Sequence, residues 1–158
     1  MKPMLVFFSV AALFFSAACA PTHQYVPFPD LSVPVENRQK ARIYVLRPAT
    51  MGGALSISVR DGEREIGKTG GRAFLCWERK AGENARVVAV TESAFGSKVI
   101  PQTSGIGFEV EEGKAYYVIM HIRLWGRTEL EIADEMKGKR VLVKCRQPKV
   151  ETFSEGKR

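Results

Sequence analysis

Three cysteines and two histidines carry the side chains in this 158-residue chain that are best suited to covalent chemistry or metal binding. Cys19 follows an apolar N-terminal run, whereas Cys76 and Cys145 lie far apart in the rest of the chain. No two cysteines form a Cys-x-x-Cys motif, so their spacing does not indicate a redox-active dithiol. His23 and His121 are also widely separated, and a zinc site needs three or four protein ligands. We therefore expect no metal site.

The chain shows no motif for nucleophilic catalysis or nucleotide binding. A catalytic triad needs a serine, a histidine and a carboxylate in contact, and no serine here lies in a G-x-S-x-G context. There is no P-loop and no G-x-G-x-x-G, and Gly105-Ile106-Gly107 precedes an expected strand instead of a helix. We expect a protein that is not an enzyme and uses no cofactor.

An apolar run at residues 115–125 carries the clearest candidate binding face. Side chains alternate between the two faces of a strand, and one face of this run is wholly apolar. The other face carries Tyr117, His121, Arg123 and Trp125. Such rings and basic groups on one face predict a patch that stacks on a sugar or a peptide. The alternative is the edge of a second core layer, or a surface that the N-terminal segment covers.

The N-terminus has the pattern of a secretory signal peptide. Lys2 precedes an apolar run at residues 5–15, which is too short to span a bilayer, and small residues lead to Cys19. Cleavage after residue 18 resembles processing of a bacterial lipoprotein, whose new N-terminal cysteine receives a diacylglyceryl group and a fatty acid such as palmitate. The usual Leu at −3 is Ser16 here, and the alternative is an ordinary secreted protein. An Asp directly after the lipidated cysteine resembles a signal for retention in the inner membrane of enteric bacteria. Ala20 occupies that position here, which favours the outer membrane, with the domain facing the periplasm.

Acylation of Cys19 would leave an even pair of cysteines in an oxidising compartment. We therefore predict a disulfide between Cys76 and Cys145, which would close a loop of about 70 residues and contribute roughly 4 kcal/mol in the chain-entropy model. The alternatives are two separate buried thiols, or a Cys19 that pairs instead.

Residues 19–40 are rich in proline, which predicts an extended tether between the lipid and the domain. The apolar side chains of this stretch leave a second interpretation open, an edge segment that packs along the domain. We place the domain itself at residues 41–147. Residues 148–158 are polar and basic, and we expect a disordered tail.

Alternating apolar residues and turn signals predict seven or eight short strands in the domain. Strands are expected at residues 42–47, 55–59, 63–68 and 115–125, and a hairpin at 72–92. Residues 93–106 read as a loop. Residues 134–145 are expected to form a short helix capped by Asp134, although a last strand is the alternative. The pattern as a whole predicts an all-β fold, a small antiparallel β-sandwich.

Several short motifs resemble a bacterial envelope family known as domain of unknown function 2846. They are ARIYVLRP at residues 41–48, the strand–Asp-Gly–strand unit, the glycine-turn hairpin and EEGKAYYV at residues 111–118. The resemblance spans residues 41–145. It implies a transthyretin- or immunoglobulin-like sandwich and membership of a group rich in lipoproteins, and it implies no established activity. The hairpin turn Ala81-Gly82-Glu83 departs from the Pro-Gly that is common in the family.

The net charge of +7 lies almost entirely at the C-terminal end. Residues 137–158 hold eight Lys or Arg and two Glu, a net +6. A basic tail on a near-neutral envelope domain argues against a nucleic-acid partner. We expect a non-catalytic lipoprotein that is held on the membrane by its N-terminal lipid and binds or assembles with another envelope protein. The alternatives are a lipoprotein that binds envelope glycans or polyanions, and a periplasmic inhibitor of a cell-wall hydrolase.

Overall fold

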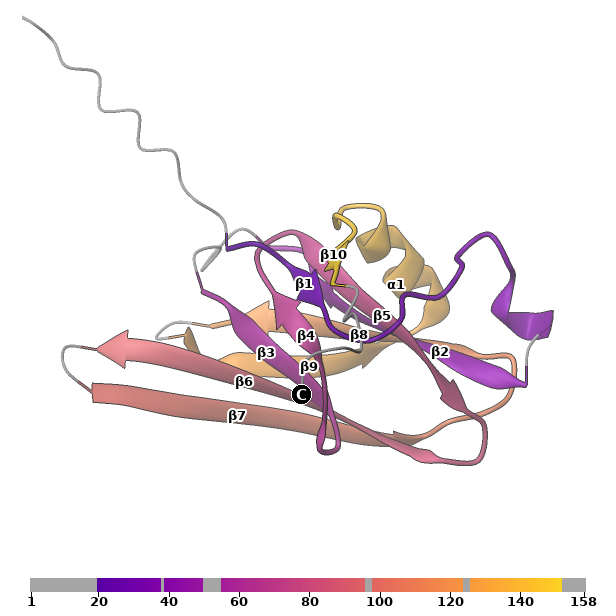
Figure 1. The fold of residues 1–158 in the computed structure, drawn as a ribbon, viewed down its shortest axis with the longest axis horizontal. Coiled ribbons are helices and arrows are strands. Elements are labelled where there is room, and N and C mark those ends of the chain that lie inside the picture. Colours follow the sequence, from indigo (N-terminus) through magenta and orange to yellow (C-terminus); the bar gives the residue numbers. More distant parts are fainter. Residues whose placement is uncertain (1–19, 38, 50–54, 96–97, 124–125, 152–158) are drawn as a thin grey trace, which may run out of the picture.

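The computed structural model describes residues 20–37, 39–49, 55–95, 98–123 and 126–151, which form two β-sheets packed face to face (Figure 1). The first sheet has six strands in the order β10-β1-β4-β3-β6-β7, and the second has four in the order β5-β2-β8-β9. The strands are β1 (His23–Gln24), β2 (Lys40–Arg47), β3 (Ile57–Asp61), β4 (Arg64–Thr69), β5 (Ala73–Lys80), β6 (Asn84–Phe95), β7 (Lys98–Glu109), β8 (Ala115–Ile122), β9 (Thr128–Ala133) and β10 (Lys149–Val150). A short 3-10 turn, η1 (Val35–Asn37), and one helix, α1 (Glu135–Leu142), complete the described elements.

This architecture confirms the predicted β-sandwich with a short helix near the C-terminus. It differs in one respect, because both sheets are mixed and not purely antiparallel. β1 pairs with β10 in parallel, and β2 pairs with β8 in parallel. Each parallel pair joins strands that are far apart in the sequence, so neither could be a hairpin.

The core lies on both faces of β2. Ile43 and Val45 point into the main cluster between the two sheets, together with Val59, Leu75 and Val118. Tyr44 and Leu46 point the other way, into a second cluster with Phe74, Tyr117 and Ile119. The continuous apolar run of this strand therefore reflects burial on both sides.

The two arms of the expected central hairpin do form strands, but they do not pair with each other. β5 pairs with β2 in the second sheet, whereas β6 pairs with β3 and β7 in the first. Gly82, with φ of +79°, lies in the turn at which the chain crosses between the sheets. Alternation indicates a strand in each arm, but it does not indicate which sheet each arm joins.

The prediction of a loop at residues 93–106 is also wrong, because most of this stretch forms two paired strands. β6 and β7 are both twelve residues long and pair along their whole length, from Asn84 opposite Glu109 to Phe95 opposite Lys98. They project as a ribbon beyond β3 (Figure 1). Pro101 is compatible with β7 because that strand lies at the sheet edge, where a missing N–H is tolerated.

The described part of the predicted tether, from residue 20 onward, packs on the domain. β1 pairs with β4 and β10, Val26 lies in the main core, and Phe28 packs on Phe74 with ring centroids 5.9 Å apart. The edge-segment interpretation is therefore the one that describes this stretch, and the folded domain begins near Ala20 and not at residue 41. Removing these apolar side chains from water outweighs the preference of a proline-rich chain for a free, extended form.

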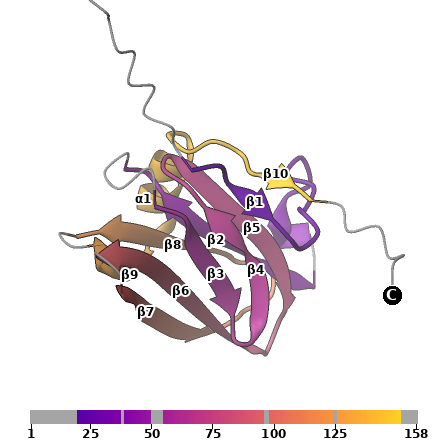
Figure 2. The same cartoon turned by 60° about the vertical axis from the view of Figure 1, so that its left-hand side comes forward.

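In the C-terminal region the predicted helix is confirmed, and the first part of the expected disordered tail forms a short strand instead. Asp134 caps α1, because its side chain accepts a hydrogen bond from the Lys137 backbone N–H at 2.8 Å. Beyond it, residues 149–150 form β10 beside β1 (Figure 2), so this part of the expected tail is ordered, and residues 152–158 lie outside the described residues. No helix in the described part of the chain is long and apolar enough to cross a membrane.

Candidate functional site

Helix α1 covers one part of the predicted binding face on β8 and leaves the other part at the surface. Tyr117 is only 3% exposed and stacks on Tyr44, with ring centroids 5.0 Å apart and planes 6° from parallel. Gly138 of α1 lies against the ring so closely that a methyl group there would overlap it. Tyr117 is therefore a core residue beneath the helix, and its expected role in ligand stacking is wrong.

His121 and Arg123 remain at the surface, where acidic side chains of β9 pair with them. His121 Nε2 lies 3.0 Å from Glu131 Oε2, and Arg123 Nε lies 2.8 Å from Glu129 Oε2. Lys137 of α1 pairs with Glu131 as well, and its hydrogen bond together with that of His121 lowers the pKa of this carboxyl. The predicted ligand-binding face is thus a surface on which His121 and Arg123 contact carboxylates of β9, and Trp125 lies outside the described residues.

The two cysteines of the domain are free thiols, so the predicted disulfide between Cys76 and Cys145 is absent. A parallel bridge places Ala73 beside Arg146, and Cys145 precedes that bridge while Cys76 lies three residues beyond it. The two residues are therefore not opposite each other at this bridge. A disulfide requires α-carbons within about 7 Å. Cys19, the expected lipidation site, lies outside the described residues.

Neither thiol has the character of a nucleophile. Burial is the main cause that raises the pKa of Cys76, and burial also raises the pKa of Cys145 to about 11. Both groups are therefore protonated at neutral pH, and the thiolate is the reactive form of cysteine. Among the residues that the structure describes, no three His, Cys, Asp or Glu side chains gather as a metal ion would require.

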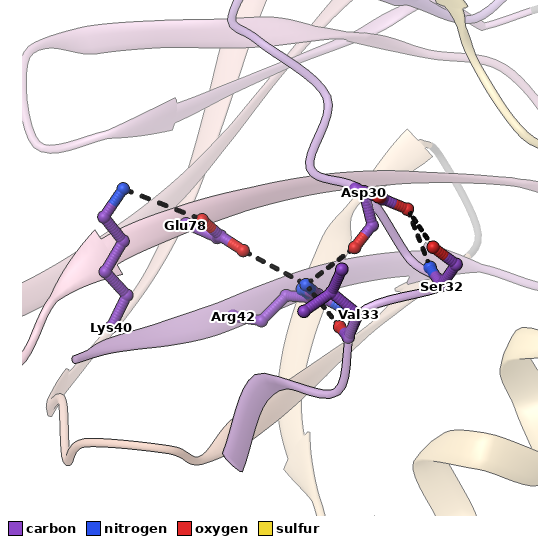
Figure 3. Close-up of polar contacts among 6 residues, drawn as sticks. All are labelled: Asp30, Ser32, Val33, Lys40, Arg42 and Glu78. Atoms are coloured by element: carbon purple, nitrogen blue, oxygen red, sulfur yellow. Dashed lines mark hydrogen bonds and ion pairs between the residues drawn. The ribbon is translucent and has the colours of Figure 1, made fainter. Parts of the chain in front are cut away.

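A buried arginine fixes the N-terminal segment to the second sheet (Figure 3). Arg42 on β2 is 3% exposed, and its Nη2 donates to the backbone carbonyl oxygens of Asp30 and Val33 at 3.1 and 3.2 Å. The same nitrogen lies 3.1 Å from Glu78 Oε1, and Lys40 approaches the other oxygen of that carboxylate at 3.8 Å. This cluster satisfies a buried charge while it holds residues 30–33 in place, so its role is structural.

The side-chain amide of Gln24 closes the outer edge of β5. Gln24 is fully buried; its Oε1 accepts from the Cys76 backbone N–H at 2.9 Å, and its Nε2 donates to the Cys76 carbonyl at 2.6 Å. One side chain therefore makes the two hydrogen bonds that a neighbouring strand residue would make. Because β1 belongs to the other sheet, this contact also joins the two sheets along this side.

The opposite side of the sandwich is open at β7. This strand is the last of its sheet, and in the described part of the chain no strand pairs with its outer edge. On its outward face, Gly105 and Gly107 carry no side chains, and with Arg86 and Val88 of β6 they line a groove of about 650 Å³. The outer edge of an unpaired strand presents free backbone N–H and C=O groups, with which the backbone of another extended chain can form hydrogen bonds.

A second surface gathers positive charge at the end of the sandwich where the described chain begins. We call it the basic end and define it as residues 20–22, 70–73 and 143–149. Nine residues of these segments line a small pocket of about 210 Å³, among them Ala20, Arg72, Arg146 and Lys149. Its exposed cations are Arg72, Lys144, Arg146 and Lys149, and these three segments contain no Asp or Glu. Arg72 adopts a φ of +53°, a conformation in which glycine is usual.

The sequence indicated part of this basic end and not the rest. Lys144, Arg146 and Lys149 belong to the basic run identified near the C-terminus. The structure separates them from Lys137 and Lys139, which pair with Glu131 and Glu135 beside α1. Arg72 comes from a turn in the middle of the chain, so only the fold could add it to the group. The β7 edge was missed because most of this strand, residues 98–106, was interpreted as a loop.

Comparisons of the chain with protein-family models, curated proteins and solved structures find no match. The resemblance to the envelope family therefore stays a prediction, and the function must be inferred from the contacts described above.

Proposed function

We propose that this chain is a non-catalytic lipoprotein of the bacterial cell envelope. In this proposal its β-sandwich binds an extended segment of another envelope protein by strand addition at β7. The observation that carries it is the twelve-residue edge strand β7, which is open in a molecule where Gln24 occupies the β5 edge at Cys76.

The chemistry of the groove favours a protein strand over a small ligand. Backbone hydrogen bonds along an edge give affinity for any extended chain, and pockets for alternate side chains give selectivity. Here exposed Gly105 and Gly107 leave room for alternate side chains of the incoming strand. The partner segment is therefore extended, with apolar side chains at every second position where it crosses this floor.

The buried polar groups of the described chain support a binding role over a catalytic one. Arg42 and Gln24 use their hydrogen-bonding atoms to hold backbone in place, and the two thiols have raised pKa values. The predicted glycan-binding alternative loses Tyr117, which lies beneath α1. No described contact favours a hydrolase inhibitor.

The anchor is tested by intact mass. We expect the membrane form of the protein to begin at Cys19 with acyl chains attached, and Cys19→Ser to abolish acylation. An unmodified wild-type chain that is soluble in the periplasm would remove the anchor from the proposal.

The interaction is tested by filling the groove. Gly105→Lys with Gly107→Lys should abolish cross-linking to the partner in cells, because lysine side chains occupy the floor and their charge opposes strand pairing. The fold should survive, since a Cβ at either position makes only ordinary contacts, at 3.6 Å from Val88 Cγ2 and 3.7 Å from the Ala85 carbonyl oxygen.

The matched control adds lysine at Ser56, an exposed residue away from β7. Ser56→Lys should retain the partner. A photo-cross-linker at Thr103 should give adducts that the same reagent at Ser56 does not give. Identical adducts at both positions, or partner recovery unchanged by the glycine variants, would contradict strand addition at β7.

A further inference from the structure

The first residues of the described chain are fixed directly on the sandwich, without a flexible spacer. Ala20 packs so tightly on Gly70 that a methyl group at Gly70 would overlap its carbonyl oxygen. Thr22 Oγ1 accepts from the Gly70 N–H at 2.9 Å, and the Thr22 carbonyl accepts from the Lys149 N–H at 3.0 Å. One peptide bond joins Ala20 to Cys19, so any group attached to Cys19 is held close to this end of the domain.

The basic end defined above lies at this same part of the sandwich, next to Ala20. Strands β4 and β5 meet here in the turn that contains Arg72, and the segment from α1 to β10 passes the start of β1 (Figure 2). Arg72, Lys144, Arg146 and Lys149 are exposed, and within the described residues no ion pair to a carboxylate is formed by any of these four. Three of these cations, Arg72, Arg146 and Lys149, line the same small pocket as Ala20, the residue that follows the proposed acylation site.

An apolar residue accompanies the charges. Val143, at the C-cap of α1 and next to Lys144, is 83% exposed, more than any other large hydrophobic residue in the described chain. Apolar side chains beside Lys and Arg suit the boundary between lipid headgroups and acyl chains.

We propose that the basic end is a membrane-contacting surface, on which these four side chains bind the phosphate groups of anionic phospholipids. This inference rests on the proposed acylation of Cys19, which would bring the surface to the headgroup layer. Each Lys or Arg close to an anionic membrane strengthens binding by roughly fivefold, and the attraction falls off within a Debye length. The lipid and the basic end would then hold the sandwich in one orientation, with β1 leading away from the membrane.

The test uses the chain from Ala20 onward, which lacks any acyl group but contains every strand and the helix that the structure describes. At low salt it should bind vesicles that contain phosphatidylglycerol and not vesicles of phosphatidylcholine alone. Lys144→Glu with Arg146→Glu should weaken that binding by roughly 30-fold or more, because two contacts of about fivefold each are lost.

The matched control reverses two exposed cations at the other end of the sandwich, Arg64 at the start of β4 and Lys80 at the end of β5. Arg64→Glu with Lys80→Glu changes the net charge equally and should leave vesicle binding nearly unchanged. Equal loss in the two double variants, or equal binding to both kinds of vesicle, would overturn the inference.

Intact mass of the protein extracted from membranes separates this inference from the proposed function. An acylated protein whose unacylated domain ignores phosphatidylglycerol refutes the basic end and leaves the anchor standing. An unacylated protein whose domain binds phosphatidylglycerol through the basic end refutes the anchor and supports the surface.

Discussion

At the scale of single residues, Gly138 shows how close packing between two elements can require the absence of a side chain. Gly138 is the only buried residue of α1, and it faces the ring of Tyr117. Helix propensity alone would favour alanine there by about 1 kcal/mol. The close approach of α1 to β8 explains why glycine is needed in the middle of a helix.

Gly138→Ala should therefore destabilise the protein, by about 1–3 kcal/mol, because overlap with Tyr117 outweighs the gain in helix propensity. Urea unfolding followed by circular dichroism measures the change. Arg140→Ala, at an exposed position of the same helix, should stay within about 0.5 kcal/mol of wild type. A more stable Gly138→Ala variant would mean that α1 does not lie on Tyr117.

At the scale of elements, the sequence predicted the positions of individual strands better than it predicted which strands pair with each other. Period-two alternation identified β2 and β3, and the cap at Asp134 identified α1, because these signals are local. The pairing of β5 with β2 depends on residues 26 to 40 positions apart, as in Ala41 opposite Arg79. Likewise, the prolines of residues 20–34 fit either interpretation, and contacts distant in sequence decide that this segment lies on the domain: the pairing of β1, the burial of Val26 and the hydrogen bonds of Gln24 and Arg42.

Gln24→Ala should cost about 2–3 kcal/mol of stability, because the backbone N–H and carbonyl of Cys76 lose their partners in a buried environment. His23→Ala, the neighbouring substitution, removes an ion pair to Glu151 that is partly exposed and should cost less than about 1 kcal/mol. Hydrogen exchange offers a site-specific measurement, since the Cys76 amide should lose protection only in the Gln24 variant. If both variants are equally stable, the side-chain amide does not close β5.

At the scale of the whole molecule, one carboxylate links the two sheets. Asp61 ends β3 in the first sheet and is 5% exposed. Its Oδ2 accepts from Trp77 Nε1 at 3.0 Å and lies 2.6 Å from Arg79 Nη1, both on β5 of the second sheet, while Oδ1 accepts from the Arg86 N–H. The sequence placed Asp61 in an Asp-Gly turn, whereas the turn proper is Gly62-Glu63, because Asp61 pairs with Arg64 as the last residue of the strand.

Asp61→Ala should destabilise the sandwich by about 2–4 kcal/mol, since the Trp77 Nε1–H and the Arg86 backbone N–H lose their acceptor, and the partly exposed Arg79 keeps only Glu83 as a carboxylate partner among the described residues. Glu63→Ala, on the same hairpin but exposed, should change stability by no more than about 0.5 kcal/mol. The two free energies of unfolding, measured side by side in urea, give the comparison. A loss for Asp61 as small as that for Glu63 would show that this link between the sheets contributes little.

The position of β1 between β4 and β10 also has a consequence for the order of events during biosynthesis. β1 is the first strand of the described chain and β10 the last, so the six-stranded sheet remains incomplete until residue 150 is available. A chain exported N-terminus first would thus present residues 23–24 to the periplasm long before their final neighbour arrives. If the chain is exported and acylated as proposed, closure of this sheet would have to wait until residue 150 has also left the export channel.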